Sequence, residues 1–314
     1  MAKEHAMIES GRRQSLSKRI WKNRWVYLFL LPGIAFVLLF CYGPMYGLVV
    51  AFKDYKISKG ILGSPWANPW YNNFAMMFKD KKFNAAFFNT IRMGLAYIIT
   101  GFPGPIILAL LLNEIRVKWF KRVTQTLLYL PHFLSWVVIG ATAYAMFATN
   151  SGVINTLIAN AGKSPIPFLQ EDAWWLFSYI LIGIWQTMGW GTIIYLAAIT
   201  NVNSELYEAA KVDGANRWQQ CLHVTLPCIR STIVVMLIMQ LGKLMGGSFE
   251  RIVALSNAKA TEYTTTIPVL VFKWFQGNKF SESTALGLFQ SVIGVILVVA
   301  SDKIAKKLGE DGLL

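Results

Sequence analysis

Charged residues, cysteine and histidine are scarce in this chain. Of its 314 residues only 15% are charged, whereas about a quarter of the residues in an ordinary soluble domain carry a charge. The mean hydropathy of +0.44 points the same way. The three cysteines form no Cys-x-x-Cys pair and the three histidines are widely separated. Nothing in this pattern indicates a disulfide framework or a metal site.

Catalytic motifs are absent as well. The sequence has no Gly-x-x-x-x-Gly-Lys-Ser/Thr loop, so it predicts no nucleotide site in this chain. His132 is followed closely by Ser135, but no glycine-rich nucleophile turn accompanies them. We interpret His132 as a hydrogen-bonding residue of a kinked helix. The chain is therefore predicted to be no enzyme and to hold no cofactor of its own.

Long apolar runs are what the sequence has instead. A helix needs about 20 residues to cross the hydrocarbon core of a bilayer, so the runs predict an all-α polytopic membrane protein with six transmembrane helices. The spans are predicted at about 25–50, 87–112, 123–148, 173–199, 228–249 and 283–300, within one transmembrane domain at 25–304. Glycines and prolines at 101–105 predict a kink in the second span, and Pro131 interrupts the third.

The net charge of +14 comes from basic residues that cluster beside the predicted spans. This placement indicates membrane flanks and not a nucleic-acid surface. By the positive-inside rule, the tails at 1–24 and 305–314 and the loop at 113–122 are cytoplasmic. The polar segment at 200–227 is then also cytoplasmic. The loop at 52–86 carries six lysines on the outside, but long loops follow the rule loosely.

The polar segment between the fourth and fifth spans has strong helix signals. Asn203 and Ser204 are good helix caps, and Leu206, Ala209, Ala210 and Asp213 share one face at helical spacing. Gly214 permits a bend. A second short helix is predicted from Ala215 to Leu226, closed by Pro227. An ordinary amphipathic interfacial helix explains the cap and the bend, but not the alanine pair followed by Asp-Gly-Ala.

The run from Glu208 to Pro227, EAAKVDGANRWQQCLHVTLP, resembles the EAA loop of ABC importer permeases. Three further stretches are similar to one branch of that family, the carbohydrate permeases of the multiple-sugar and polysaccharide (LplB) type. They are the segment Tyr42–Tyr55, the pair Asn89-Thr90 and the ending Lys307–Gly312. The segment 252–281 departs from the family's pattern.

The resemblance implies the membrane subunit of an ATP-driven importer in the bacterial cytoplasmic membrane. Such a permease passes an oligosaccharide, delivered by a lipid-anchored extracellular binding protein, through the membrane by alternating access. The implied partners are a second, non-identical permease and two cytoplasmic ATPase subunits that bind ATP and magnesium. The alternatives are an ABC permease for a non-sugar solute and an ion-coupled carrier working alone, which would typically show internal repeats.

By the same resemblance, the cytoplasmic helix is a coupling helix that docks into a groove on an ATPase subunit. The expected coupling residues are Glu208, Ala209, Ala210, Asp213, Gly214 and Ala215. Their role is mechanical, since they carry the motion of the ATPase pair into the membrane helices. For Asp213 alone, a local turn-stabilising role is an equal alternative.

The fifth predicted span carries the most unusual polar pattern. Gln240, Lys243, Gly247 and Glu250 lie at i, i+3, i+7 and i+10, which on one helix forms a single stripe. Unpaired polar groups at membrane depth are costly, so the stripe is expected to face protein or a wet cavity. We interpret it as lining the translocation path, with Lys243 as a contact for an acidic sugar. A structural contact with the paired permease or another helix is the alternative.

Aromatic and amide side chains on the third and fourth spans form a second candidate group for the path. They are Tyr144, Trp185, Gln186 and Trp190. Aromatic faces suit the apolar C–H faces of sugars, although aromatics are also ordinary packing residues in membranes. Arg92, early in the second span, is expected to reach the outer headgroups.

Overall fold

The computed structural model describes residues 21–310 and 312–313. Residues 1–20 of the predicted tail at 1–24 lie outside the described residues. The described part consists of helices and their connections, and its one isolated β-bridge joins Lys53 to Trp66. The prediction of an all-α chain is confirmed.

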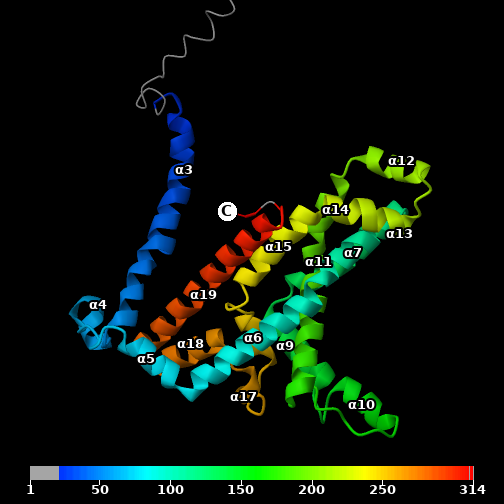
Figure 1. The fold of residues 1–314 in the computed structure, drawn as a ribbon. Helices are drawn as coiled ribbons and strands as arrows, with labels where there is room; N and C mark the ends of the chain where they lie inside the picture. Colours follow the sequence, from blue (N-terminus) through cyan, green and yellow to red (C-terminus); the bar gives the residue numbers. More distant parts are fainter. Residues whose placement is uncertain (1–20, 311, 314) are drawn as a thin grey trace, which may run out of the picture.

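The short helices of the connections gather at two opposite ends of the molecule (Figure 1). One end carries α12 (Ser204–Val212) and α13 (Arg217–Gln220), together with the C-terminus. The other end carries α4 (Gly60–Gly63), α10 (Val153–Asn160) and α17 (Thr261–Thr264). The long helices run between these two ends.

The first long helix stands apart from the others (Figure 1). It consists of α3 (Arg24–Phe36), a π-helical segment η1 (Val37–Tyr42) and a 3-10 segment η2 (Gly43–Phe52). None of its residues up to Tyr42 is buried. Only its far end, η2, packs against the body of the protein, on α19 (Phe280–Lys307). The connection that follows contains η3 (Ile57–Lys59) and α5 (Asn72–Lys79).

The second long helix is interrupted where the glycine–proline cluster predicts a kink. It is formed by α6 (Lys81–Gly101) and α7 (Pro103–Glu114), with Phe102 between them. It begins earlier than residue 87 because the Asp80 side chain caps it, accepting a hydrogen bond of 2.7 Å from the Lys82 amide.

The third span is broken. It consists of α8 (Lys118–Tyr129), η4 (Leu130–Phe133) and α9 (Trp136–Phe147), and the two halves meet at 99°. Pro131 lies in the 3-10 turn at the break, where it cannot continue an α-helical ladder. The predicted loop at 113–122 is too long, because its basic residues from Lys118 onward already belong to α8.

The fourth span, α11 (Asp172–Thr200), agrees closely with the predicted 173–199 and lies at the centre of the bundle. Its buried face includes Trp175, Tyr179 and Ile182, which join one hydrophobic cluster with residues of α9 and of the segment after the fifth span. The apolar pattern of this helix lies within its own sequence, so its bounds can be predicted without knowledge of the packing.

The predicted end of the second cytoplasmic helix at Pro227 is wrong. The helical path continues from α13 through the π-helical η5 (Cys221–Thr225) and through α14 (Leu226–Cys228), because Pro227 lies in the first turn of α14, where no amide donor is needed. The chain bends by 62° only at Ile229, before α15 (Arg230–Gly242).

The prediction of one helix over 228–249 is also wrong. α15 ends at Gly242, and the turn that follows contains Gly247 with φ +51°, a conformation that favours glycine. The chain then forms α16 (Phe249–Leu255), which packs against α9.

The segment 250–281, which lies between the predicted fifth and sixth spans, is folded into the core. It contains α16, α17 and α18 (Ile267–Gln276), and its buried side chains include Ile252, Leu255 and Leu270. α19 follows and is longer than the predicted 283–300. Four helices of the described chain are long and apolar enough to cross a membrane, or up to six if each of the two bent pairs is one span.

We expect Gly140→Ala to destabilise the contact between α9 and α16. A Cβ atom at Gly140 would lie 2.7 Å from the Ala254 carbonyl oxygen, so the helices must separate. Overpacking of this kind costs about 1–3 kcal/mol. The measurement is the thermal midpoint of the detergent-solubilised protein. Gly287→Ala is the control, because nothing lies within 4 Å of that position. Equal midpoints for the two variants would contradict the tight packing.

Candidate functional site

A cavity of about 350 Å³ lies among the helices of the bundle. Its wall is built from α6, η4 and α11 on one side and from α15, the glycine turn and α16 on the other. The early end of α15 is what opens this space, because the chain turns away at Gly242 where a continuous helix would have filled it. A volume of this size is in the range of small-ligand sites.

Arg251 is the most unusual residue of the cavity wall. It belongs to α16 and only 3% of its surface is exposed. Its guanidinium carbon lies 4.3 Å from the ring centre of Tyr97 and 4.5 Å from that of Tyr179, and Trp136 lies slightly farther away at 5.3 Å. Its Nη2 donates a hydrogen bond of 2.5 Å to the Ser248 hydroxyl. Three aromatic rings therefore hold the guanidinium in place.

Buried polar atoms without a hydrogen-bond partner concentrate at this cavity. The described chain has six such side-chain atoms, and four belong to residues of the cavity wall: Nε and Nη1 of Arg251, Nδ1 of His132 and Oγ1 of Thr266. Native proteins leave few buried polar groups unsatisfied, and each one calls for a water, an ion or a ligand. The cavity is therefore suited to a polar occupant.

The cavity wall also offers an aromatic face. The rings of His132 and Trp190 are stacked, with their centres 4.6 Å apart and their planes inclined by only 5°. His132 is thus a wall residue of the cavity at the break of the third span. Its position at the break agrees with the expected histidine of a kinked helix. Its ring stacks on Trp190, however, and its Nδ1 has no hydrogen-bond partner among the described residues.

The residues predicted for the path divide into two groups. Gln240, Lys243, Gly247 and Trp190 line the cavity. The predicted single helical stripe is nevertheless wrong in its geometry, because α15 ends at Gly242 and Lys243 and Gly247 belong to the turn. Glu250 is exposed on α16 and is not part of the wall.

The other aromatic and amide candidates lie beside the cavity. Trp185 is 49% exposed and does not line it. Gln186 is buried and its amide lies 3.5 Å from the His132 carbonyl oxygen, so it supports the break of the third span. The Tyr144 hydroxyl donates to the Ser256 carbonyl at 3.2 Å and thereby ties α9 to the end of α16. Gln186 and Tyr144 therefore make contacts within the protein in this arrangement.

The end of the bundle that carries α17 is fastened by polar contacts. Arg92 forms a two-pronged ion pair with Asp172, with distances of 2.6 and 2.5 Å, so it joins α6 to α11 and does not reach for headgroups as expected. The Tyr263 hydroxyl donates to the Gln170 carbonyl. Burial, followed by the nearby carboxylates of Asp172 and Glu171, raises the pKa of Tyr263. The phenol therefore keeps the proton with which it donates.

At the opposite end, α12 forms a closed helical unit outside the bundle. The Asn203 side chain accepts a hydrogen bond of 3.0 Å from the Glu205 amide, as the predicted cap requires. At the other end the amide of Gly214 donates to Lys211 at 3.1 Å and that of Ala215 donates to Ala210 at 2.8 Å. This is a Schellman motif, and Gly214 adopts the left-handed conformation that it needs, with φ +81°.

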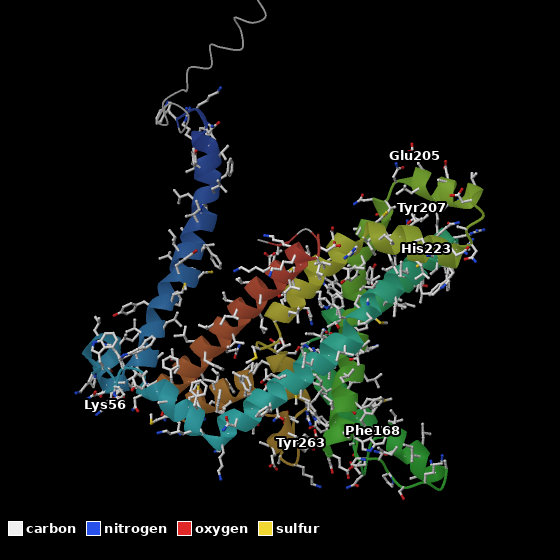
Figure 2. The ribbon with its side chains drawn as sticks, viewed as in Figure 1. Lys56, Phe168, Glu205, Tyr207, His223 and Tyr263 are labelled. Carbon is white, nitrogen blue, oxygen red and sulfur yellow. The ribbon has the colours of Figure 1, made fainter. Side chains whose placement is uncertain are left out.

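The two halves of the segment between α11 and α15 are held together by a few contacts. The Tyr207 and Thr225 hydroxyls are hydrogen-bonded at 3.0 Å, joining α12 to η5. Asn216 and Gln219 form a reciprocal capping box at the start of α13. Arg217 forms an ion pair of 2.8 Å with Glu114 at the end of α7. Figure 2 shows Tyr207 and His223 on the two facing halves, with Glu205 at the outer edge.

α12 presents its residues to the outside. None of them is buried, and Val212 is 88% exposed. Glu208 and Ala209 are exposed, and Ala210 is partly covered by the following segment. The Asp213 carboxylate makes no hydrogen bond or ion pair with any residue that the structure describes, although its backbone amide closes the helix on Ala209. Asp213 therefore stabilises the bend through its backbone and leaves its charge available.

Comparison with known proteins places this arrangement in a family. Residues 101–308 match the model of the binding-protein-dependent transport system inner membrane component. The chain belongs to this family. It is 41% identical to the polygalacturonan/rhamnogalacturonan transport system permease protein YteP of Bacillus subtilis, over 99% of this chain and 97% of that protein. Protein LplB of the same organism is 38% identical, over 98% and 96%.

A solved relative has the same fold. A chain in the crystal structure of a bacterial alginate ABC transporter, in complex with an alginate pentasaccharide-bound periplasmic protein, superposes with a TM-score of 0.86 at 34% identity. That match covers 96% of this chain and all of that one. The suspected relationship to carbohydrate permeases is confirmed. This permease is thus a multi-pass membrane transport component and not a catalytic one, and the ion-coupled carrier is not supported.

Arg251 and Tyr97 are among the wall residues that the sequence analysis missed. Arg251 follows the helix-breaking Gly246-Gly247 pair by four residues and precedes the apolar run that begins at Ile252, and an arginine in this position is the signal that points to it. Tyr97 has no such signal, because only its neighbours in space distinguish it from a packing tyrosine.

We expect the cavity to be accessible to water, because it holds unsatisfied polar atoms. In a background in which Cys41, Cys221 and Cys228 are replaced by serine, Gln240→Cys is expected to react with a charged thiol reagent faster than Ile238→Cys. Ile238 lies on the same helix and is buried. The expected ratio of labelling rates is about tenfold or more, or about 1.4 kcal/mol. Equal rates in the solubilised protein would contradict a wet cavity.

Proposed function

We propose that this permease is the membrane subunit of an ATP-driven importer that translocates an oligosaccharide by alternating access. The observation that carries the proposal is the position of α12, a fully capped helix with no buried residue that protrudes at one end of the bundle. A helix with exposed Val212 and exposed Glu208 is suited to a protein groove. The names of YteP and of the alginate transporter support the carbohydrate substrate.

In this proposal the chain crosses the membrane six times, and the two bent helix pairs count as the third and fifth spans. α12 and both termini are cytoplasmic, and the protein lies in the bacterial cell membrane. The grouping of α12 and the C-terminus at one end, opposite α10 and α17, supports this orientation (Figure 1). The basic residues at the start of α8, near that same end, support it as well.

ATP and magnesium belong to two cytoplasmic ATPase subunits, each of which receives a coupling helix. The coupling residues are Glu208, Ala209, Ala210, Asp213, Gly214 and Ala215. Since α12 is tied to η5 through Tyr207 and Thr225, its displacement moves the helical path that leads into α15. Gln240, near the end of α15, is part of the cavity wall, so motion at the ATPase reaches the cavity.

A second, non-identical permease covers the detached first helix. The exposed apolar side chains of α3 and η1 and their separation from the rest of this chain support such a partner. A lipid-anchored extracellular binding protein delivers the substrate at the α10 and α17 end. The solved alginate transporter, which was crystallised with its periplasmic protein, supports this partner.

The cavity is the proposed passage for the sugar. The stacked pair of His132 and Trp190 provides a flat face for the C–H surface of a pyranose ring. Gln240 and the unsatisfied hydroxyl of Thr266 provide hydrogen-bonding groups for hydroxyls. This combination of an aromatic face and polar edges suits the ring and the hydroxyl groups of a sugar.

The coupling role is tested by Gly214→Val. A branched residue in the left-handed conformation costs about 1–2 kcal/mol, which opens the Schellman motif and misdirects the docking face. With the permease pair, the ATPase and the binding protein in proteoliposomes, we expect sugar uptake to fall about tenfold. Stimulation of ATP hydrolysis by the loaded binding protein is expected to fall with it.

Gly162→Val is the matched control for this experiment. Gly162 also has a positive φ, +75°, and open space around it, but it lies in the connection at the opposite end of the molecule. Its variant carries the same backbone strain and is expected to keep uptake near that of the parent. An equal loss in both variants would argue against a coupling role for α12.

A further inference from the structure

Arg251 is a buried cation without an anion. Among the described residues its side chain has no ion-pair partner, and of its three nitrogens only Nη2 has a hydrogen-bond partner there, the neutral hydroxyl of Ser248. A buried charge is costly unless it is both paired and hydrogen-bonded. The aromatic rings of Tyr97 and Tyr179 offset part of this cost. The rings cannot accept hydrogen bonds from Nε and Nη1 as well as an oxygen atom would.

The fold makes room for this guanidinium. Gly183 of α11 lies directly beside it, and a Cβ at that position would collide with Nη1. The tyrosine faces and the Ser248 bond fix the plane of the group, so its position in the wall is defined before any ligand arrives. A fixed, planar donor with free N–H groups is the arrangement that recognises a carboxylate.

The charge of the cavity has one sign. Among the described residues that line it there is no aspartate or glutamate, while Arg251 and Lys243 are both present. Lys243 makes no ion pair within the described chain either. Three other arginines differ, because Arg92 is paired with Asp172, Arg217 with Glu114 and Arg230 with Glu310. The part of the chain that the structure describes therefore supplies no anion to this cavity.

We propose that Arg251 binds the carboxylate of a uronate residue during passage, with Lys243 as a second contact, so that the substrate is an acidic oligosaccharide. This inference rests on the proposed importer function and adds the chemical class of its substrate. The stacked rings of His132 and Trp190 take the sugar face, and Arg251 reads the group at C6. The carboxylate of each uronate then serves as the counterion of Arg251 as the sugar passes.

The competing role for Arg251 is that of a brace that joins α16 to α6 and α11 through its aromatic contacts. The two roles predict different results. A brace is indifferent to the charge of the sugar, so its loss lowers the transport of acidic and neutral glycans equally. A carboxylate contact affects the acidic glycan alone, and a lysine at the same position preserves part of the transport.

The test uses the complete importer in proteoliposomes, with trigalacturonate and galactotriose as probes, since these differ only in a carboxylate at C6. The variants are Arg251→Gln, Arg251→Lys and Lys243→Gln. We expect Arg251→Gln to lower trigalacturonate uptake roughly tenfold or more, the scale of a lost hydrogen bond to a charged group. Arg251→Lys retains more uptake than Arg251→Gln, and Lys243→Gln gives a smaller loss of the same selectivity.

Three results would overturn the inference. In the first, the parent importer takes up galactotriose but not trigalacturonate. The second is trigalacturonate uptake within twofold of the parent in both Arg251→Gln and Lys243→Gln. The third is an equal loss for both glycans in Arg251→Gln. If Arg251→Gln does not assemble with the ATPase on gel filtration, Lys243→Gln decides alone by the same twofold criterion, because its side chain is exposed to the cavity and makes no contact on which folding depends.

Failure of the proposed importer function gives a different result from failure of this inference. If the parent neither co-elutes with the ATPase nor shows ATP hydrolysis stimulated by a loaded binding protein, both proposals are overturned. If assembly and stimulation are intact in every variant and only the selectivity for trigalacturonate is missing, the importer stands and the role of Arg251 is wrong.

Discussion

A polar group inside a membrane protein must find its partner within the protein, because lipid offers none. Most of this bundle obeys the rule locally: Arg92 pairs with Asp172, and the Tyr144 hydroxyl donates to the Ser256 carbonyl. Of the six exceptions among the described residues, four gather at one place, where Arg251, His132 and Thr266 leave polar atoms without partners around a cavity, and the other two are Nε of Arg92 and Oγ1 of Thr149. The same rule that organises the rest of the bundle therefore marks the place where something other than protein belongs.

The cavity exists because two spans are broken at the same level. Pro131 ends the first half of the third span, and Gly242 ends the fifth before it has filled the space beside α11. A methyl group at Gly242 would meet Val298 of α19, so the glycine also permits a close approach of α15 and α19. Irregular backbone at membrane depth is tolerated only where protein or a wet cavity surrounds it. The cavity therefore forms because the two helices are broken, and the breaks are tolerated because they border the cavity.

Much of the fold could be predicted from the sequence because it depends on local signals. The fourth span follows from its long apolar run, and α12 follows from the Asn203 cap and the Gly214 bend, both of which act over a few residues. The end of α15 and the helices of the segment 250–281 could not be predicted, since they depend on packing against α9 and α19. Four of the eight predicted path residues line the cavity, but Arg251 does not follow from periodicity, because its importance lies in the absence of a partner.

The geometry also explains how a short helix outside the bundle can act on a cavity inside it. α12 is tied to η5 by the hydrogen bond between Tyr207 and Thr225, and η5 continues through α14 into α15. α15 has 13 residues, so it carries displacement over about 20 Å at 1.5 Å per residue. At its far end the chain enters the turn with Gly246 and Gly247, where backbone rotation is least restricted. In the coupling that we propose, a push on α12 passes the 62° bend at Ile229, reaches Gln240 along α15 and is absorbed next to Lys243 and Arg251. The groups that face the occupant lie on the two sides of that turn, so its rotation changes the distance between them and alters the grip on whatever the cavity holds.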